Sequence, residues 1–292
     1  MRSMFVMSDR QPETAATRTD RFEEFRADGS PSFGLAFADI GRGLACWRIW
    51  LTLAASDIRQ KYRGSLLGPL WVTISMLAFT VGIGVVYANL FNVDVHAFLP
   101  HVAVGMVAWT LITGLINESC TALTEAEGYL KQIRLPLSLF VCRVVARNLL
   151  VLLHHALIVV AVLVWFGVPV SLLDVGLALL ALALLALSGY GWGLALACIC
   201  MRFRDVSQIV ATIITGAFFI TPVLWKGSFL AEDHPALLLN PFYYLLEILR
   251  QPLTTGHSDP VHWLVSGLIA LTGLLAGLLT FRAARPRITY WT

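Results

Sequence analysis

Long stretches without a charged residue dominate the hydrophobic pattern of this 292-residue chain. Each of the six longest stretches matches or exceeds the roughly 20 apolar residues that cross the ~30 Å hydrocarbon core of a bilayer as a helix. They cover residues 64–93, 95–117, 148–173, 175–201, 206–225 and 260–281. Lipid offers no partner to backbone amides, and the ten-residue alternation of a membrane barrel does not occur. The pattern therefore predicts an all-α membrane protein with six transmembrane helices.

Residues 44–63, which precede the first apolar stretch, follow a helical pattern with two different faces. Trp47 and Trp50 fall on the apolar face, and Arg59 and Arg63 fall on the polar face at 100° per residue. Tryptophan on one face and arginine on the other are typical of an amphipathic helix that lies in the membrane interface. The alternative is a helix that packs on a partner protein.

The remaining segments complete the expected domain organisation. Residues 1–43 are polar and predict a cytoplasmic N-terminal tail, to which we assign no role. Residues 44–63 form the interface helix, and residues 64–292 form the six-helix transmembrane domain. Within that domain we expect a cytoplasmic loop at 118–135 and a long external segment at 226–259.

The basic residues predict the orientation. Seventeen of the 21 Lys and Arg residues lie in 1–63, in 118–135, in 202–205 or near the C-terminus, and only Lys226 and Arg250 fall on the other side. Basic residues are enriched on the cytoplasmic side of membrane proteins. Both termini are therefore predicted to be cytoplasmic. All five cysteines map to the cytoplasmic half, where thiols stay reduced.

Composition excludes several classes of protein. Hydrophobic residues make up 58% of the chain and charged residues 13%, about half the usual ~25% of a soluble domain. A water-soluble globule and a disordered chain are both excluded on this basis. The net charge of +3 is too small to suggest a nucleic-acid partner.

The chain lacks the residue patterns that bind ATP or catalyse hydrolysis. Its three lysines follow Gln60, Leu130 and Trp225, so a Gly-Lys-Ser/Thr phosphate-binding loop is impossible. No Gly-X-Ser-X-Gly or His-Glu-X-X-His pattern occurs. Cys198 and Cys200 have no nearby histidine or acid to complete a metal site, which favours packing. We therefore predict a chain that is not an enzyme and holds no cofactor or metal of its own.

The apolar stretches also lack the acidic residues that ion-driven carriers keep at mid-membrane depth. His154 and His155 lie near the middle of the third stretch. Packing or pore lining is the favoured interpretation of this pair, and a proton relay is the alternative. An energy source on another polypeptide is the simpler expectation.

Four arginines are candidates for binding a phosphate-bearing lipid headgroup at the inner leaflet. Arg143 and Arg147 are four residues apart and share a helix face, and Arg59 and Arg63 do the same. Guanidinium groups match phosphate oxygens in geometry and charge. The alternative is that these side chains anchor helix ends in lipid.

Aromatic residues within the apolar stretches are candidates for lining a path for sugars, because the apolar faces of sugars stack on aromatic rings. Contact with lipid or with neighbouring helices is the commoner role of such residues. The candidates are Trp71, Phe79, Tyr87, Trp192, Phe218 and Phe219.

Five short motifs together resemble a known family. The motifs are Asp57–Trp71 (DIRQKYRGSLLGPLW), Leu130–Pro136 (LKQIRLP), Arg202–Val206 (RFRDV), Thr221–Val223 (TPV) and Asn240–Tyr243 (NPFY). They resemble the permease subunits of ATP-binding-cassette exporters for polysaccharides such as O-antigen and teichoic acid. The similarity covers roughly residues 44–290.

The resemblance implies a homodimer of this chain with two copies of a separate ATPase subunit, which binds the ATP and Mg²⁺. It implies that the first cytoplasmic loop contacts that ATPase and that external helices cap the path. The implied ATPase-coupling residues are Thr124, Glu125, Glu127, Lys131 and Arg134, and the implied cap residues are Phe242, Tyr243 and Tyr244.

The function expected from this resemblance is export of a polyprenyl-pyrophosphate-linked polysaccharide across the bacterial inner membrane. A small-molecule or drug exporter of the same architecture is one alternative. A membrane-embedded enzyme that processes glycans is another, although most such enzymes need carboxylates or a metal. We therefore expect four kinds of partner: a second copy, the ATPase, the lipid-linked polysaccharide and membrane lipids.

Overall fold

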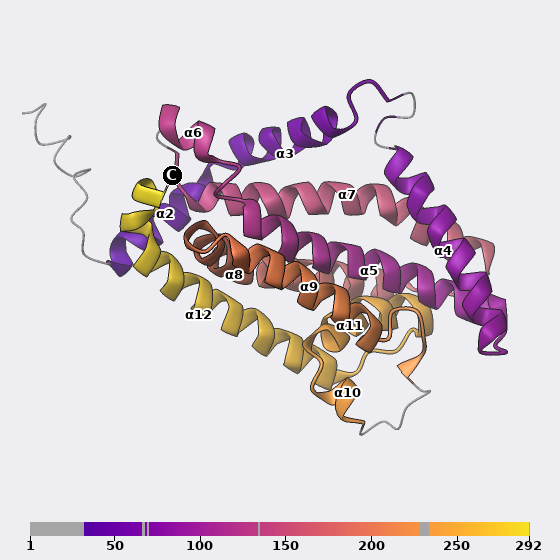
Figure 1. Ribbon diagram of the computed structural model, residues 1–292. Helices are drawn as coiled ribbons and strands as arrows, with labels where there is room; N and C mark the ends of the chain where they lie inside the picture. The colour runs from indigo at the N-terminus through magenta and orange to yellow at the C-terminus, as the bar shows by residue number, and fades with distance from the viewer. Residues whose placement is uncertain (1–31, 66–67, 69, 134, 228–233, 292) are drawn as a thin grey trace, which may run out of the picture.

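The computed structural model of this chain describes residues 32–65, 68, 70–133, 135–227 and 234–291. Every regular element in this described part is a helix, which confirms the predicted all-α class (Figure 1). The helices, in chain order, are α2 (Phe33–Ala45), α3 (Trp47–Lys61), α4 (Leu70–Leu90), α5 (Val95–Thr121), α6 (Glu127–Gln132), α7 (Ser138–Trp165), α8 (Leu172–Arg202), α9 (Asp205–Ile220), α10 (Pro235–Leu238), α11 (Pro241–Thr255) and α12 (Pro260–Trp291).

Five described helices, α4, α5, α7, α8 and α12, are long and apolar enough to cross a membrane. The fifth predicted span falls on α9, whose 16 residues extend only about 24 Å at 1.5 Å per residue. α9 ends before Pro222, where Thr221 has φ −80° and ψ 135°. A following proline favours this extended conformation. The predicted count of six membrane-length helices is therefore not confirmed.

Helix α5 is the centre of the bundle. In its most apolar 18-residue window 72% of the residues are buried, against 17% in the corresponding window of α4. α5 contacts α4, α7, α8, α9 and α11. Figure 1 shows α2, α6 and the C-terminus at one end of the bundle and α10 and α11 at the other. We call these the α6 end and the α11 end.

The most extensive contact between two helices joins α8 and α12. Its closest approach is at Gly191, where a Cβ atom would lie 2.5 Å from the backbone nitrogen of Leu274. Next to it, the indole Nε1 of Trp192 donates a hydrogen bond of 3.0 Å to the carbonyl oxygen of Ile269. Small residues at such a crossing let two membrane helices approach closely and gain van der Waals contact.

Helix α2 is fastened to the bundle by the buried side chain of Asp39. Its carboxylate accepts hydrogen bonds from the backbone N–H groups of Ser138 (3.1 Å) and Leu137 (3.4 Å). α7 begins there without a side-chain cap from its own residues, so Asp39 satisfies otherwise unpaired amides from another helix. The segment predicted as a tail, 1–43, thus ends in a folded helix, and its residues 1–31 lie outside the described part.

The predicted interface helix corresponds to α3, and the chain bends at Cys46 between α2 and α3. α3 packs against α7 and buries Ala54 and Ile58. Trp47 remains 52% exposed. One face of α3 therefore contacts the bundle, and the opposite face is available to lipid or to a partner.

Candidate functional site

An ion-pair network joins α3, α5 and α7 toward the α6 end. Asp57 on α3 accepts two hydrogen bonds from Arg143, from Nε at 2.7 Å and from Nη2 at 2.5 Å. Arg147 donates to Asp57 at 3.2 Å and to Glu118 on α5 at 2.8 Å. We call these four residues the Asp57 network. The two-point contact between Arg143 and Asp57 is the strong, directional form of an arginine–carboxylate pair.

The Asp57 network is largely shielded from solvent. The side chains of Asp57, Arg143 and Arg147 are 14%, 12% and 17% exposed. Glu125 lies 3.9 Å from Arg147 and adds a further carboxylate, so two arginines face three acids. Glu118 also accepts from the amide of Asn148 at 2.6 Å. The positive charge of both arginines is thus compensated within the chain.

The structure separates the four predicted headgroup arginines into two kinds. Arg143 and Arg147 point to protein carboxylates, as described above. Arg59 and Arg63 are exposed and form no ion pair with any described residue. The headgroup role stays a prediction, and the exposed pair is the one whose charge remains available.

The predicted ATPase-coupling segment touches the bundle with Tyr129 and Leu130, and the ring of Tyr129 lies 6.2 Å from that of Phe140. α6 buries none of its residues, and Figure 1 shows it at the edge of the α6 end. Glu127 lies 3.9 Å from Lys131 and 3.9 Å from Arg204. Ion pairs as long and as exposed as these contribute little to stability. Their charges can therefore change partners at low cost.

The turn that precedes α6 is better anchored. Glu125 accepts a hydrogen bond of 2.8 Å from the hydroxyl of Thr121 and lies 3.9 Å from Arg147, which links this turn to the Asp57 network. The hydroxyl of Thr124 lies 3.6 Å from the sulfur of Met201. Arg134 lies outside the described residues. The coupling role of this segment stays a prediction.

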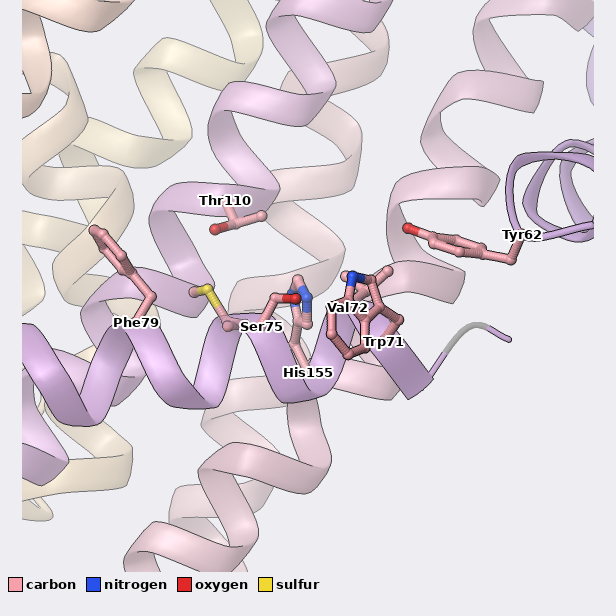
Figure 2. Close-up of a pocket in the computed structure, with 8 residues that line it drawn as sticks. Tyr62, Trp71, Val72, Ser75, Phe79, Thr110 and His155 are labelled. Carbon is pink, nitrogen blue, oxygen red and sulfur yellow. The ribbon is translucent and has the colours of Figure 1, made fainter. Parts of the chain in front are cut away.

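Two of the six predicted path aromatics share a cavity. Trp71 and Phe79, both on α4, line a space of about 500 Å³ together with residues from α3, α5 and α7 (Figure 2). Phe218 on α9 packs instead on Trp109, with ring centroids 5.7 Å apart, and on the neighbouring Phe219 at 5.4 Å.

The other two aromatics lie elsewhere. Tyr87 packs edge-on against Phe91 with centroids 5.6 Å apart, and Trp192 lies at the α8–α12 crossing. The six candidates therefore occupy four places in the chain. Their role as path-lining residues stays a prediction.

The predicted cap residues cluster at the beginning of α11. Phe242 packs against Trp109 at 5.7 Å, and the hydroxyl of Tyr244 donates a hydrogen bond of 3.0 Å to the carbonyl oxygen of Leu238. The ring of Tyr243 contacts that of His262 at 5.1 Å. Burial raises the pKa of the Tyr243 phenol to about 12, so this group stays neutral at physiological pH.

Arg250 on α11 is buried, which the sequence pattern did not predict. From the sequence it is only a positive charge in the external segment. Its side chain is 1% exposed and pairs with Glu247. It also donates hydrogen bonds to the carbonyl oxygen of Pro222 at 2.6 Å and to Nε2 of His101 at 2.9 Å. The available signal was an acid and a base three residues apart among leucines. Arg250 ties α11 to α5 and to the end of α9.

Membrane-length helices, a charged network that joins three of the helices and an exposed charged loop are the features expected of a multi-pass membrane transport subunit. The chain belongs to the ABC-2 type transporter family, whose model matches residues 48–253, from α3 almost to the end of α11. It is similar to the "O-antigen export system permease protein RfbA" of Myxococcus xanthus. The two are 28% identical over 204 residues, which cover 67% of this chain and 76% of that protein.

These comparisons confirm the resemblance to permease subunits of ATP-binding-cassette exporters. The chain is therefore the membrane subunit of a transporter, and membership of this family implies pairing with an ATP-binding subunit. The network and the exposed loop described above lie within the matched residues.

Proposed function

We propose that this chain moves a polyprenyl-pyrophosphate-linked, O-antigen-like polysaccharide across the bacterial inner membrane, with ATP hydrolysed on partner subunits. The observation that carries the substrate is the similarity to the Myxococcus xanthus permease over two thirds of the chain. The excess of basic residues near the α6 end supports a cytoplasmic location for that end and for both termini.

A sixth crossing is part of this proposal. α9 and the extended residues that follow it reach further than the helix alone. Non-helical backbone within a membrane is tolerated where protein buries it. Thr221 and Val223 are fully buried, and the carbonyl oxygen of Pro222 is paired with Arg250. These contacts support a crossing made of α9 and the segment 221–225.

The proposed route for energy begins at α6 and the turn before it, where the ATPase would dock. Glu125 in this turn is connected through Arg147 to Asp57 and Arg143. Movement of the loop would thus reach α3 and α7 through ion pairs. All of these ion pairs lie within one copy of the chain.

Two copies of the chain are proposed to enclose the path. A polar polymer must be shielded from lipid, and helix α4 is only loosely attached to its own bundle, with 17% of its window buried. On α9, Ile213 and Phe219 are 60% and 71% exposed. A second copy would cover such faces, and the exposed Arg59 and Arg63 would hold the carrier's pyrophosphate.

The test is reconstitution of the purified chain with its partner ATPase, in vesicles that contain lipid-linked polysaccharide. We expect movement of the polysaccharide only when ATP and both proteins are present. A matched control uses an ATPase in which the lysine of the phosphate-binding loop is replaced. Transport of a drug without transport of glycan, or transport in the absence of any ATPase, would contradict the proposal.

A further inference from the structure

The cavity next to α4 lies between the end of α3 and the helices α4, α5 and α7. Figure 2 shows Tyr62, from the end of α3, at one side of the cavity, and Phe79 at the opposite side, with Trp71 between them. Its volume of about 500 Å³ falls within the ~300–1,000 Å³ of typical ligand sites. Because α4, α5 and α7 are membrane-length helices, molecules of the bilayer can reach this cavity.

The lining of this cavity is mainly apolar. Val72, Met76 and Phe79 add aliphatic and aromatic surface to that of Trp71. Trp71 and Phe79 are eight residues apart, about 12 Å along α4. This length is close to half of the ~30 Å hydrocarbon core. A single hydrocarbon chain of one bilayer leaflet matches both the length and the chemistry.

One buried polar atom in the lining, Nε2 of His155, has no hydrogen-bond partner among the described residues. His155 is 3% exposed. By contrast, the hydroxyl of Thr110, which also lines the cavity, donates to the carbonyl oxygen of Met106 at 2.8 Å. Leaving a buried polar group unpaired costs about 1–3 kcal/mol. A ligand that brings a hydrogen-bonding group to His155 would remove this cost.

Two cations flank a residue of the lining in the chain. Tyr62 directly follows Lys61 and precedes Arg63, and both are exposed and have no ion-pair partner among the described residues. Burial raises the pKa of the Tyr62 phenol, so it remains a neutral hydrogen-bond donor. An ammonium group and a phenol next to an apolar cavity favour a ligand with an anionic head and an apolar chain.

We propose that this cavity binds a glycerophospholipid of the bilayer, with one acyl chain along α4, the ester carbonyl at His155 and the phosphate near Lys61. A glycerophospholipid carries ester carbonyls between its phosphate and its chains, so it can satisfy His155 and Lys61 together. An isoprenoid phosphate has no such group, because its hydrocarbon begins directly after the phosphate. The bound lipid is thus a component of the bilayer and not the transport substrate, and the inference does not depend on the proposed function.

The test measures lipid binding to the full-length, delipidated chain in detergent by native mass spectrometry. Phosphatidylglycerol with ester-linked chains is compared with its ether-linked analogue, which keeps the head and chains but lacks the carbonyls. We expect the ester lipid to bind about twofold to tenfold more tightly, the range of one hydrogen bond. Equal binding of the two lipids would overturn the proposal.

Two histidine variants test whether the preference for the ester lipid arises at His155. In His155→Leu the ratio between ester and ether lipid is expected to fall to one. In the matched control His154→Leu, whose Nδ1 bonds to the Leu150 carbonyl oxygen at 2.8 Å, the ratio is expected to stay unchanged. An unchanged ratio in His155→Leu would overturn the assignment of the carbonyl. The comparison on the unmodified chain needs no variant and stands if a variant fails to fold.

Two further measurements test the head and the chain. Lys61→Gln is expected to weaken phosphatidylglycerol binding by up to about fivefold. Arg48→Gln on the same helix is the control. Equal binding by the two variants would contradict the placement of the phosphate near Lys61. A photoactivatable group on the acyl chain is expected to label α4 between Trp71 and Phe79, and labelling confined to other helices would overturn the site. Displacement of the phospholipid by an equal or lower concentration of polyprenyl phosphate would assign the cavity to the carrier instead.

Discussion

Asp39 and Asp57 attach the N-terminal helices to the rest of the protein, a role that the residues next to them in the sequence do not indicate. Asp39 caps the first turn of α7 and lies 3.5 Å from Arg285 near the C-terminus. Asp57 receives the guanidinium groups of Arg143 and Arg147. In both cases the acid comes from an N-terminal helix and its partners come from helices far along the chain. These two side chains connect α2 and α3 to the membrane bundle.

Replacement of Asp57 by asparagine is expected to destabilise the protein by about 1.5–3 kcal/mol, the range of hydrogen bonds to charged groups. The reason is that Arg143 loses the carboxylate that accepts both of its hydrogen bonds. Chemical unfolding in detergent measures the change. Glu127→Gln, which affects only ion pairs of 3.9 Å at the surface, is the control and should change stability by less than about 1 kcal/mol. Equal effects of the two substitutions would contradict a special role for Asp57.

At the scale of elements, α9 and α11 depend on one another. α9 ends at a proline, and the extended residues after it gain partners from α11 and α5. Asn240, at the beginning of α11, donates a hydrogen bond of 2.9 Å to the hydroxyl of Thr221. The short helix is therefore completed by contacts from the α11 end.

The α8–α12 crossing provides a direct test of packing. Gly191→Ala places a Cβ atom about 2.5 Å from the backbone of Leu274, and overpacking of this kind costs about 1–3 kcal/mol. Gly176→Ala on the same helix is the matched control, because a Cβ atom there meets nothing within 4 Å. Thermal unfolding followed by size-exclusion chromatography measures both. A loss of stability in Gly176→Ala as large as that in Gly191→Ala would show that the crossing is not the cause.

The segment around α6 is expected to govern association with the ATPase. Reversing two charges on α6, by Glu127→Lys together with Lys131→Glu, should reduce co-purification of the ATPase without unfolding the chain, since α6 buries no residue. Pull-down and melting temperature are measured together. Asp205→Lys, at the beginning of α9, is the comparison variant. Undiminished recovery of the ATPase with the double variant would count against the docking role.

At the scale of the whole molecule, the chain forms a loose bundle around α5 with a lightly attached α4. Lipid or protein must cover α4, because its buried share is the lowest of the five membrane-length helices. The exposed Arg59 and Arg63 lie outside both the core and the Asp57 network.

The double substitution Arg59→Ala with Arg63→Ala is expected to lower substrate-stimulated ATPase activity of the assembled transporter several-fold and to leave basal activity nearly unchanged. Neither arginine has an ion-pair partner among the described residues, so the fold should tolerate the change. ATP hydrolysis is measured with and without lipid-linked polysaccharide, and Arg48→Ala is the control. A parallel fall in both activities would remove the support for headgroup binding.

The sequence predicted the helical class, the membrane location and the resemblance to exporter permeases, which the comparisons confirm. The second and fourth predicted spans end within four residues of α5 and α8, whereas the third is displaced from α7 by ten residues at its beginning and eight at its end. It did not predict that Pro222 would shorten the fifth span, although the proline is a local signal. It did not predict α2, although the largely apolar segment Phe33–Ala45 carries a local helical pattern.

What the sequence determined by itself was the protein class, because the length of a charge-free segment and the positions of basic residues are local properties that a bilayer selects directly. Only the tertiary structure decided the pairing of charges and the shape of the cavity. Asp57 and Arg143 are 86 residues apart, and His155 lines a cavity with residues from three other helices or their ends. Such neighbours are set by how helices cross, and no local pattern of residues records that geometry.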